Sequence, residues 1–140
     1  MNVGLFGWTV RATLKNIALE NTAVYSHYAS GAASIGTLTG VSGVATNIRN
    51  CYVTGVVKST EVQSNTGGLV GKNVTNSTII NSFATADVYG ARLCNVGGLV
   101  GQTLGNSILI NCYATGDVTG GASSNVGGLV GNDYSNTLVI

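Results

Sequence analysis

The chain has 140 residues, with 21 Gly, no Pro, one His and a formal net charge of +1 at pH 7. Because 44% of its residues are hydrophobic and only 8% are charged, the composition excludes a disordered chain. The lack of Pro excludes a collagen-like chain, and the small net charge argues against a surface that neutralises nucleic-acid phosphates.

The chain is built from a repeat. NTGGLVG begins at Asn65, and NVGGLVG begins at Asn95 and again at Asn125, so the motif returns at a constant spacing. The approximate copies are residues 1–33, 34–64, 65–94 and 95–124, followed by a partial copy, 125–140. A repeat of this length is typical of solenoids and related arrays.

Short apolar segments occupy the same places in each copy. The first copy is the most divergent, with VGLFG at 3–7 and LKNIALEN at 14–21. The second carries GTLTG at 36–40 and RNCYVTGVV at 49–57, and the next two carry INSFATADVYG at 80–90 and INCYATGDVTG at 110–120. These segments are rich in β-branched residues, are bounded by Gly, Asn and Ser, and lack a helical period. They therefore predict short strands.

The repeat predicts a single all-β domain over residues 1–140, a parallel β-helix (β-solenoid) of four coils plus a partial fifth, with about 30 residues in each coil. A β-propeller is the rival fold, but its blades usually need about 40 residues and four strands. In a parallel β-helix each coil lies about 4.8 Å from the next. Residues one copy apart should therefore pair, and equivalent residues should stack into columns.

The repeat predicts three kinds of column. The first kind is interior and aliphatic and occurs twice. One aliphatic column consists of Leu5, Leu38, Leu69, Leu99 and Leu129, and the other consists of Leu14, Ile48, Ile79, Leu109 and Val139. The asparagine column consists of Asn16, Asn50, Asn81 and Asn111. At a bend, such side chains are expected to pass amide hydrogen bonds from coil to coil. An aromatic stack is predicted from Ala18, Tyr52, Phe83 and Tyr113.

The glycine-rich half of the repeat resembles the GLUG motif, named for Gly, Leu, any residue and Gly. Residues 68–71, 98–101 and 128–131 match it, and residues 4–7 carry its short core. The second copy has Thr37 at the first glycine, which predicts a distorted second coil. The resemblance implies a right-handed β-helix found in large exported bacterial proteins, such as filamentous-haemagglutinin-like adhesins and non-catalytic parts of some immunoglobulin A peptidases. It implies no catalytic residues.

No metal or cofactor site is expected, because the chain has one His, no HExxH and no CxxC. Cys51 and Cys112 share a phase but lie two coils apart, roughly 10 Å by the strand spacing. A disulfide needs Cα atoms within about 7 Å. Cys94 is out of phase with both. The three cysteines are therefore predicted to be free, small and buried.

Asp87 and Asp117 are equivalent residues of adjacent coils, so their carboxylates are expected about 5 Å apart. That separation suits the carboxylate pair of a retaining glycosidase, and it also suits oxygen ligands of calcium. Val56 takes the same place in the preceding coil, and no Lys or Arg column flanks the pair. We therefore expect two solvated turn carboxylates, with calcium binding and catalysis as the alternatives.

The sequence and the resemblance together predict a non-catalytic structural or adhesive module of an exported bacterial surface protein. Its expected partners are glycans or proteins of a host or cell surface. Membrane insertion is not expected, because no run approaches about 18 apolar residues. Two alternatives stay open. One is a carbohydrate-active or carbohydrate-binding β-helix that uses Asp87 and Asp117, and the other is an extracellular fibre subunit that self-associates through its strand edges.

The repeat phase also predicts that the chain is part of a longer protein. Ile140 is equivalent to Ile80 and Ile110, after which the earlier copies continue with an Asn of the asparagine column. The second half of the fifth coil is therefore missing. The start of the chain lacks the basic segment and apolar run of a signal peptide. We expect further repeats or a cap after Ile140 and an export signal before Met1.

Overall fold

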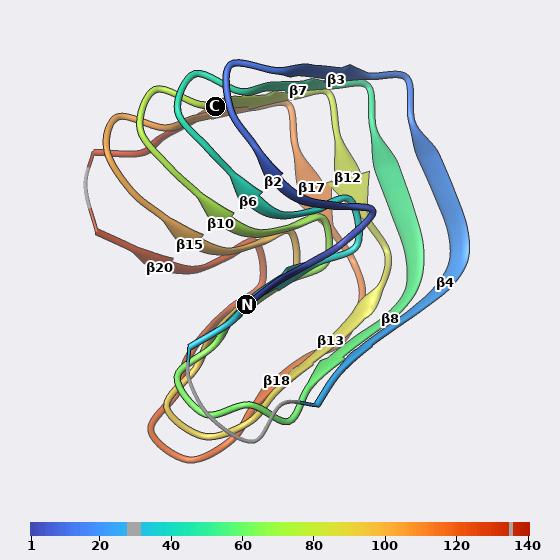
Figure 1. Ribbon diagram of the computed structural model, residues 1–140, viewed down its shortest axis with the longest axis vertical. Helices are drawn as coiled ribbons and strands as arrows, with labels where there is room; N and C mark the ends of the chain where they lie inside the picture. The colour runs from blue at the N-terminus through green and yellow to red at the C-terminus, as the bar shows by residue number, and fades with distance from the viewer. Residues whose placement is uncertain (28–31, 135) are drawn as a thin grey trace.

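The computed structural model describes residues 1–27, 32–134 and 136–140. These residues form 21 strands and no helix, and the strands pair in parallel to give four sheets (Figure 1). Each sheet receives strands from all four complete coils, so the fold is the predicted parallel β-helix. Across the described residues there is no helix with the length and apolarity to cross a membrane.

Each coil passes through the sheets in the order A, B, C and D. Sheet A contains β1 (Asn2–Val3), β5 (Ser34–Gly36), β9 (Asn65–Gly67), β14 (Asn95–Gly97) and β19 (Asn125–Gly127). Sheet B contains β2 (Phe6–Thr9), β6 (Thr39–Ser42), β10 (Val70–Asn73), β15 (Val100–Thr103) and β20 (Val130–Asp133). Sheet C contains β3 (Thr13–Lys15), β7 (Asn47–Arg49), β11 (Thr78–Ile80), β16 (Ile108–Ile110) and β21 (Leu138–Val139). Sheet D contains β4 (Ala18–Ser26), β8 (Tyr52–Ser59), β12 (Phe83–Ala84), β13 (Asp87–Gly90), β17 (Tyr113–Ala114) and β18 (Val118–Gly120).

The register between coils follows the repeat. Ile79 pairs with Ile48 on one side and with Leu109 on the other, so each residue meets its equivalent in the neighbouring copy. The prediction of a distorted second coil is wrong, because β6 keeps an unbroken register with β10. The irregularity lies in the first coil instead, where the register shifts between Leu19 and Thr22.

The leucine column is interior on the middle coils. Leu38, Leu69 and Leu99 are fully buried, and Leu129 is half-buried against the same core. The prediction that Leu5 is interior is wrong, since its side chain is 57% exposed. The first coil has a described neighbour on one side only, and Val3 rather than Leu5 packs against the core there.

The corner between sheets A and B folds inward, so the outline of the coil is indented on one side (Figure 1). A Cβ atom at Gly68 would lie 2.9 Å from Ala84 Cβ of sheet D, and one at Gly98 would lie 2.8 Å from Ala114 Cβ. On these two coils a side chain at the corner would collide with sheet D, and we call this contact of the third and fourth coils the waist. The second coil carries Thr37 and Val53 at the equivalent places. Besides the main core, a small cluster of Val88, Cys94 and Val96 lies apart from it.

The burial pattern predicts a sharp difference between two leucines of one column. Leu99→Ala opens a cavity between two occupied coils and should lower the free energy of unfolding by about 2–5 kcal/mol. Leu5→Ala, at the exposed place, should change it by less than about 0.5 kcal/mol. Urea unfolding followed by circular dichroism measures both. Equal losses for the two variants would contradict the observed packing.

Candidate functional site

The asparagine column lies at the corner between sheets C and D. Its φ angles are 57° at Asn16, 50° at Asn50, 49° at Asn81 and 50° at Asn111. Each amide nitrogen donates to the side-chain oxygen of the preceding coil, with distances of 3.2, 3.4 and 2.9 Å along the column. Asn is one of the few non-glycine residues that readily adopts this left-handed conformation. The turn itself therefore explains the column.

The aromatic stack lies beside this corner on sheet D. The ring centroids of Tyr52 and Phe83 are 4.9 Å apart and those of Phe83 and Tyr113 are 4.7 Å apart, with interplanar angles of 2° and 5°. The Tyr52 hydroxyl donates a hydrogen bond to the Glu20 carboxylate, which raises the pKa of Tyr52. Ala18, at the remaining place, adds no ring. Because Phe83 has both ring faces covered, the stack offers a ligand mainly ring edges.

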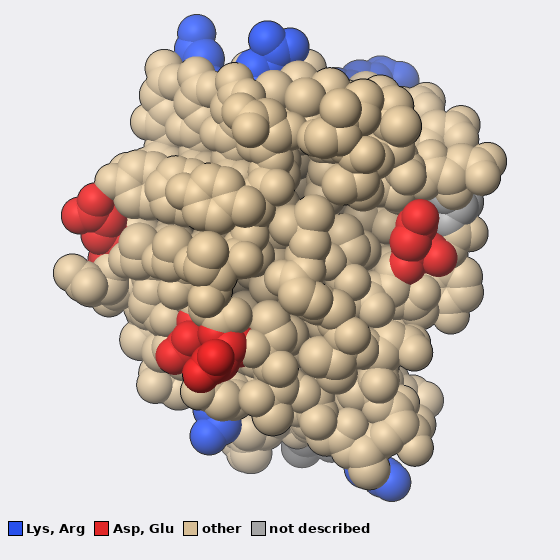
Figure 2. Space-filling view, turned by 180° about the vertical axis from the view of Figure 1, so that it is seen from behind, with Lys and Arg blue, Asp and Glu red and all other residues tan. Residues whose placement is uncertain are grey.

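The two equivalent aspartates lie on the outside of sheet D. Asp87 is half-buried and pairs with Val56, while Asp117 is exposed. The backbone N–H of Asp117 donates to Asp87 Oδ1 at 2.9 Å, so this carboxylate holds the turn of the next coil. Within the described ranges, no group of three or more His, Cys, Asp or Glu side chains could hold a metal ion. Figure 2 shows the acidic side chains of one face as separate patches on a mostly uncharged surface.

The three cysteines are free thiols. Cys51 is buried and Cys112 is half-buried, and burial raises the pKa of both thiols against the opposing effect of backbone hydrogen bonds. Cys94 belongs to a separate column of small residues. Its Sγ lies 3.2 Å from Ser64 Oγ, and its backbone N–H donates to Ser124 Oγ at 3.0 Å. The cysteines therefore fill space in the interior.

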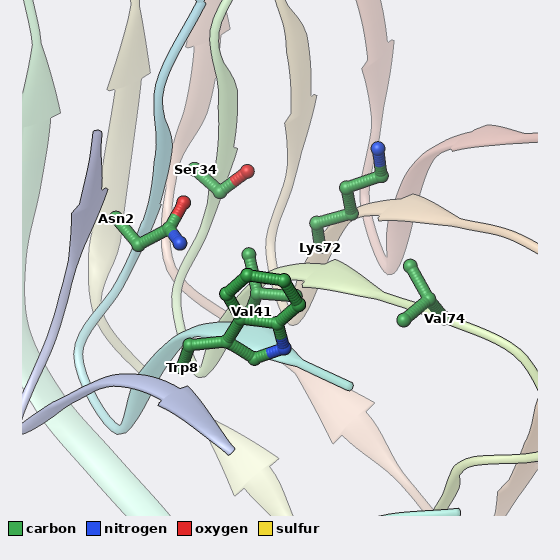
Figure 3. A pocket seen from close by; sticks show the side chains of 6 residues that line it. All are labelled: Asn2, Trp8, Ser34, Val41, Lys72 and Val74. Atoms are coloured by element: carbon green, nitrogen blue, oxygen red, sulfur yellow. The ribbon is translucent and has the colours of Figure 1, made fainter. Parts of the chain in front are cut away.

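A groove that the sequence analysis did not predict lies in the indentation between sheets A and B (Figure 3). We call it the A–B groove, and its volume is about 280 Å³. It is lined by Asn2 and Ser34 from sheet A, by Trp8, Val41 and Lys72 from sheet B, and by Val74. The groove thus brings together one aromatic ring, one cation, two polar side chains and an apolar floor.

The indole of Trp8 lies against Gly43 of the second coil, which has no side chain to displace it. The Trp8 side chain is 66% exposed, and a Cβ atom at Gly43 would lie 2.5 Å from its indole nitrogen. The indole therefore packs against a position that has no side chain. The later coils carry Val74, Leu104 and Tyr134 at that position, so only the second coil leaves room for the ring.

One amide hydrogen bond bridges the same indentation between the fifth and fourth coils. Asn132 of sheet B donates to Asn95 Oδ1 of sheet A at 3.1 Å. Asn95 in turn donates to Asn65 at 2.8 Å, and Asn125 donates to Asn95 at 2.9 Å. The places equivalent to Asn132 on the first three coils hold Trp8, Val41 and Lys72. The fourth coil holds Gln102 there, so the groove lies in a column whose residue differs on every coil.

Comparison with known proteins agrees with the repeat. The family model of the GLUG motif matches residues 63–89 and 93–119, which form most of the third and fourth coils. These two segments are therefore GLUG repeats within a β-solenoid. The first glycine of each matched motif, Gly68 or Gly98, forms the waist, so the motif marks the corner between sheets A and B.

A solved structure has a similar fold. It is the crystal structure of a putative immunoglobulin A1 protease from Bacteroides ovatus, with a TM-score of 0.65 and 23% sequence identity. The match covers 91% of this chain and 46% of that chain, so this chain spans less than half the length of that one. At this identity the likeness shows the fold alone. The comparison with curated proteins gives no match.

Two signals in the sequence could have indicated the groove. The first is Trp8, the single Trp of the chain. The second is the Asn that opens each NVGGLVG motif, at Asn95 and Asn125, which forms a second amide column on sheet A. Neither signal places the indentation, because that depends on how closely the corner approaches sheet D.

The thiols of Cys51 and Cys112 should react slowly. Thiolate is the nucleophile, and burial raises the pKa of Cys51 and Cys112 above the ordinary value of 9.0. Iodoacetamide should therefore label both more slowly in the folded chain than in the urea-unfolded chain. Since the folded-state pKa is the higher one, their contribution to stability is full below the unfolded-state pKa and is lost as the pH rises through the folded-state value.

The matched control comes from the repeat itself, because Ser82 occupies the same column as Cys51 and Cys112. A variant with Cys51→Ser and Cys112→Ser should fold, and its stability should fall less above about pH 9 than that of the original chain, because it lacks these two thiols. Mass spectrometry of the labelled peptides measures the reaction. Equal labelling rates in the folded and unfolded chains would contradict the burial of these thiols.

Proposed function

We propose that this GLUG solenoid is a non-catalytic structural and adhesive module of an exported bacterial surface protein. The observation that best supports this is the continuity of its outer columns. The exposed asparagine column and the aromatic stack both run from coil to coil along the solenoid. Stacked repeats of this kind present extended surfaces that suit contact with a partner.

Other features agree with a module inside a larger protein. The match to the Bacteroides ovatus structure covers 46% of that chain, which fits a segment that accompanies other parts. The carboxylate of Asp87 accepts a hydrogen bond from the backbone N–H of Asp117. It therefore has a structural role, whereas the carbohydrate-active alternative would need this carboxylate for its ligand. The enzyme and the fibre subunit remain rival hypotheses. The following experiment and a catalytic assay distinguish them from the proposed role.

A surface module should be reachable from outside the cell. Antibodies raised against the chain should label intact cells of the source bacterium, and brief protease treatment of those cells should remove the label. A cytosolic protein of the same cells is the control, and it should stay unlabelled and uncut. Labelling that occurs only after the cells are made permeable would contradict the proposal.

A further inference from the structure

We propose that the A–B groove binds a sugar residue that carries a carboxylate. This inference rests on the proposed adhesive role and names the chemistry of its ligand. The volume of about 280 Å³ lies just below the usual range for small-molecule pockets, so it suits one ring rather than a long chain. Three features of the groove recognise an acidic sugar: an open aromatic face, an available cation and a set of polar groups.

Trp8 supplies the aromatic surface. Its indole packs against Gly43 and remains 66% exposed, so it is positioned before a ligand arrives. An aromatic side chain held in this way contributes a large apolar contact at little cost in conformational entropy. The rings of Tyr52, Phe83 and Tyr113 are less suitable, because they stack on one another. Trp8 is therefore the site for the apolar face of a sugar ring.

Lys72 supplies the charge. It lies on β10 at the edge of the groove, half-buried, and no hydrogen bond or ion pair joins its ammonium group to another of the described residues. An ammonium group whose stem is packed and whose charge is unpaired attracts a carboxylate through charge-assisted hydrogen bonds. Figure 3 shows its side chain on the opposite side of the groove from Asn2 and Ser34.

Ser34 supplies a polar group in the wall. The residue is only 6% exposed, its side chain lines the groove, and its hydroxyl makes no hydrogen bond to the described part of the chain. A buried hydroxyl without a partner has a free donor and acceptor for a ligand. Asn2 lies next to it on sheet A, paired with Ser34 in the strand register, and adds an amide. Together they suit the hydroxyl groups of a sugar.

The contrast with the later coils supports a built site. There the bond from Asn132 to Asn95 closes the indentation at 3.1 Å. The first three coils replace that bridging residue by Trp8, Val41 and Lys72, which cannot form the same amide pair. The residue of this column differs on every coil, and the groove lies where the column carries Trp8, Val41 and Lys72.

The test uses the emission of Trp8, which reports on this groove because the chain has no other Trp. The probes are glucuronic acid and glucose, which differ only in a carboxylate against a hydroxymethyl group. We expect a saturable emission change with glucuronic acid and binding at least tenfold weaker with glucose. Higher salt should weaken the binding of glucuronic acid, because the charge pair is partly screened.

Variants separate the roles of the side chains. Lys72→Gln should weaken the binding of glucuronic acid at least tenfold and leave that of glucose unchanged. Ser34→Ala should weaken the binding of both sugars. Lys58→Gln is the matched control, since Lys58 is an exposed lysine of sheet D, and it should bind as the original chain does. Circular dichroism checks that each variant keeps its fold.

Several results would overturn the inference. These are no saturable change with glucuronic acid, equal binding of glucose, unchanged binding by Lys72→Gln, or competition by acetate as strong as that by glucuronic acid. The last result would mean a general anion site without recognition of the sugar. The measurement uses the purified chain, so a failure here leaves the surface role intact, and a failure of cell labelling leaves the groove intact.

Discussion

The waist is the constraint on which the rest of the structure depends. On the third and fourth coils, the glycine corner approaches Ala84 and Ala114 so closely that an added Cβ atom would collide with their side chains. This approach carries Leu69 and Leu99 into the core. It also indents the outer surface between sheets A and B. Core packing on the third and fourth coils therefore depends on these small residues.

The repeat period made the coil predictable. A constant spacing, with Leu and Ile returning at fixed places, is enough to predict parallel pairing and a buried column such as Ile48, Ile79 and Leu109. The periodicity does not reveal exposure at the first coil, because burial of Leu5 needs a neighbour on each side. The periodicity does not predict the waist either, because the waist joins a Gly at one corner of the coil to an Ala of the sheet across the core.

The corners show a similar division. A recurring Asn, as at Asn50 and Asn81, points to a left-handed turn, and both residues have φ near 50°. A second corner has φ of 62°, 59° and 58° at Gln63, Leu93 and Ser123, three residue types with no common preference for this conformation. At that corner the pairing between coils fixes the turn, and the local sequence does not predict it. The groove was not predicted for a related reason. Its lining residues differ from coil to coil, so the repeat pattern does not bring them together.

The central claim, that the waist needs glycine, is tested most directly by one pair of substitutions in this chain. A Cβ atom at Gly98 would lie 2.8 Å from Ala114 Cβ and 2.2 Å from the Gly128 carbonyl oxygen, whereas one at Gly128 would have nothing within 4 Å. Gly98→Ala should lower the free energy of unfolding in urea by about 1–3 kcal/mol or prevent folding. Gly128→Ala should leave it unchanged or raise it by up to about 1 kcal/mol. Equal stability of the two variants would contradict the account.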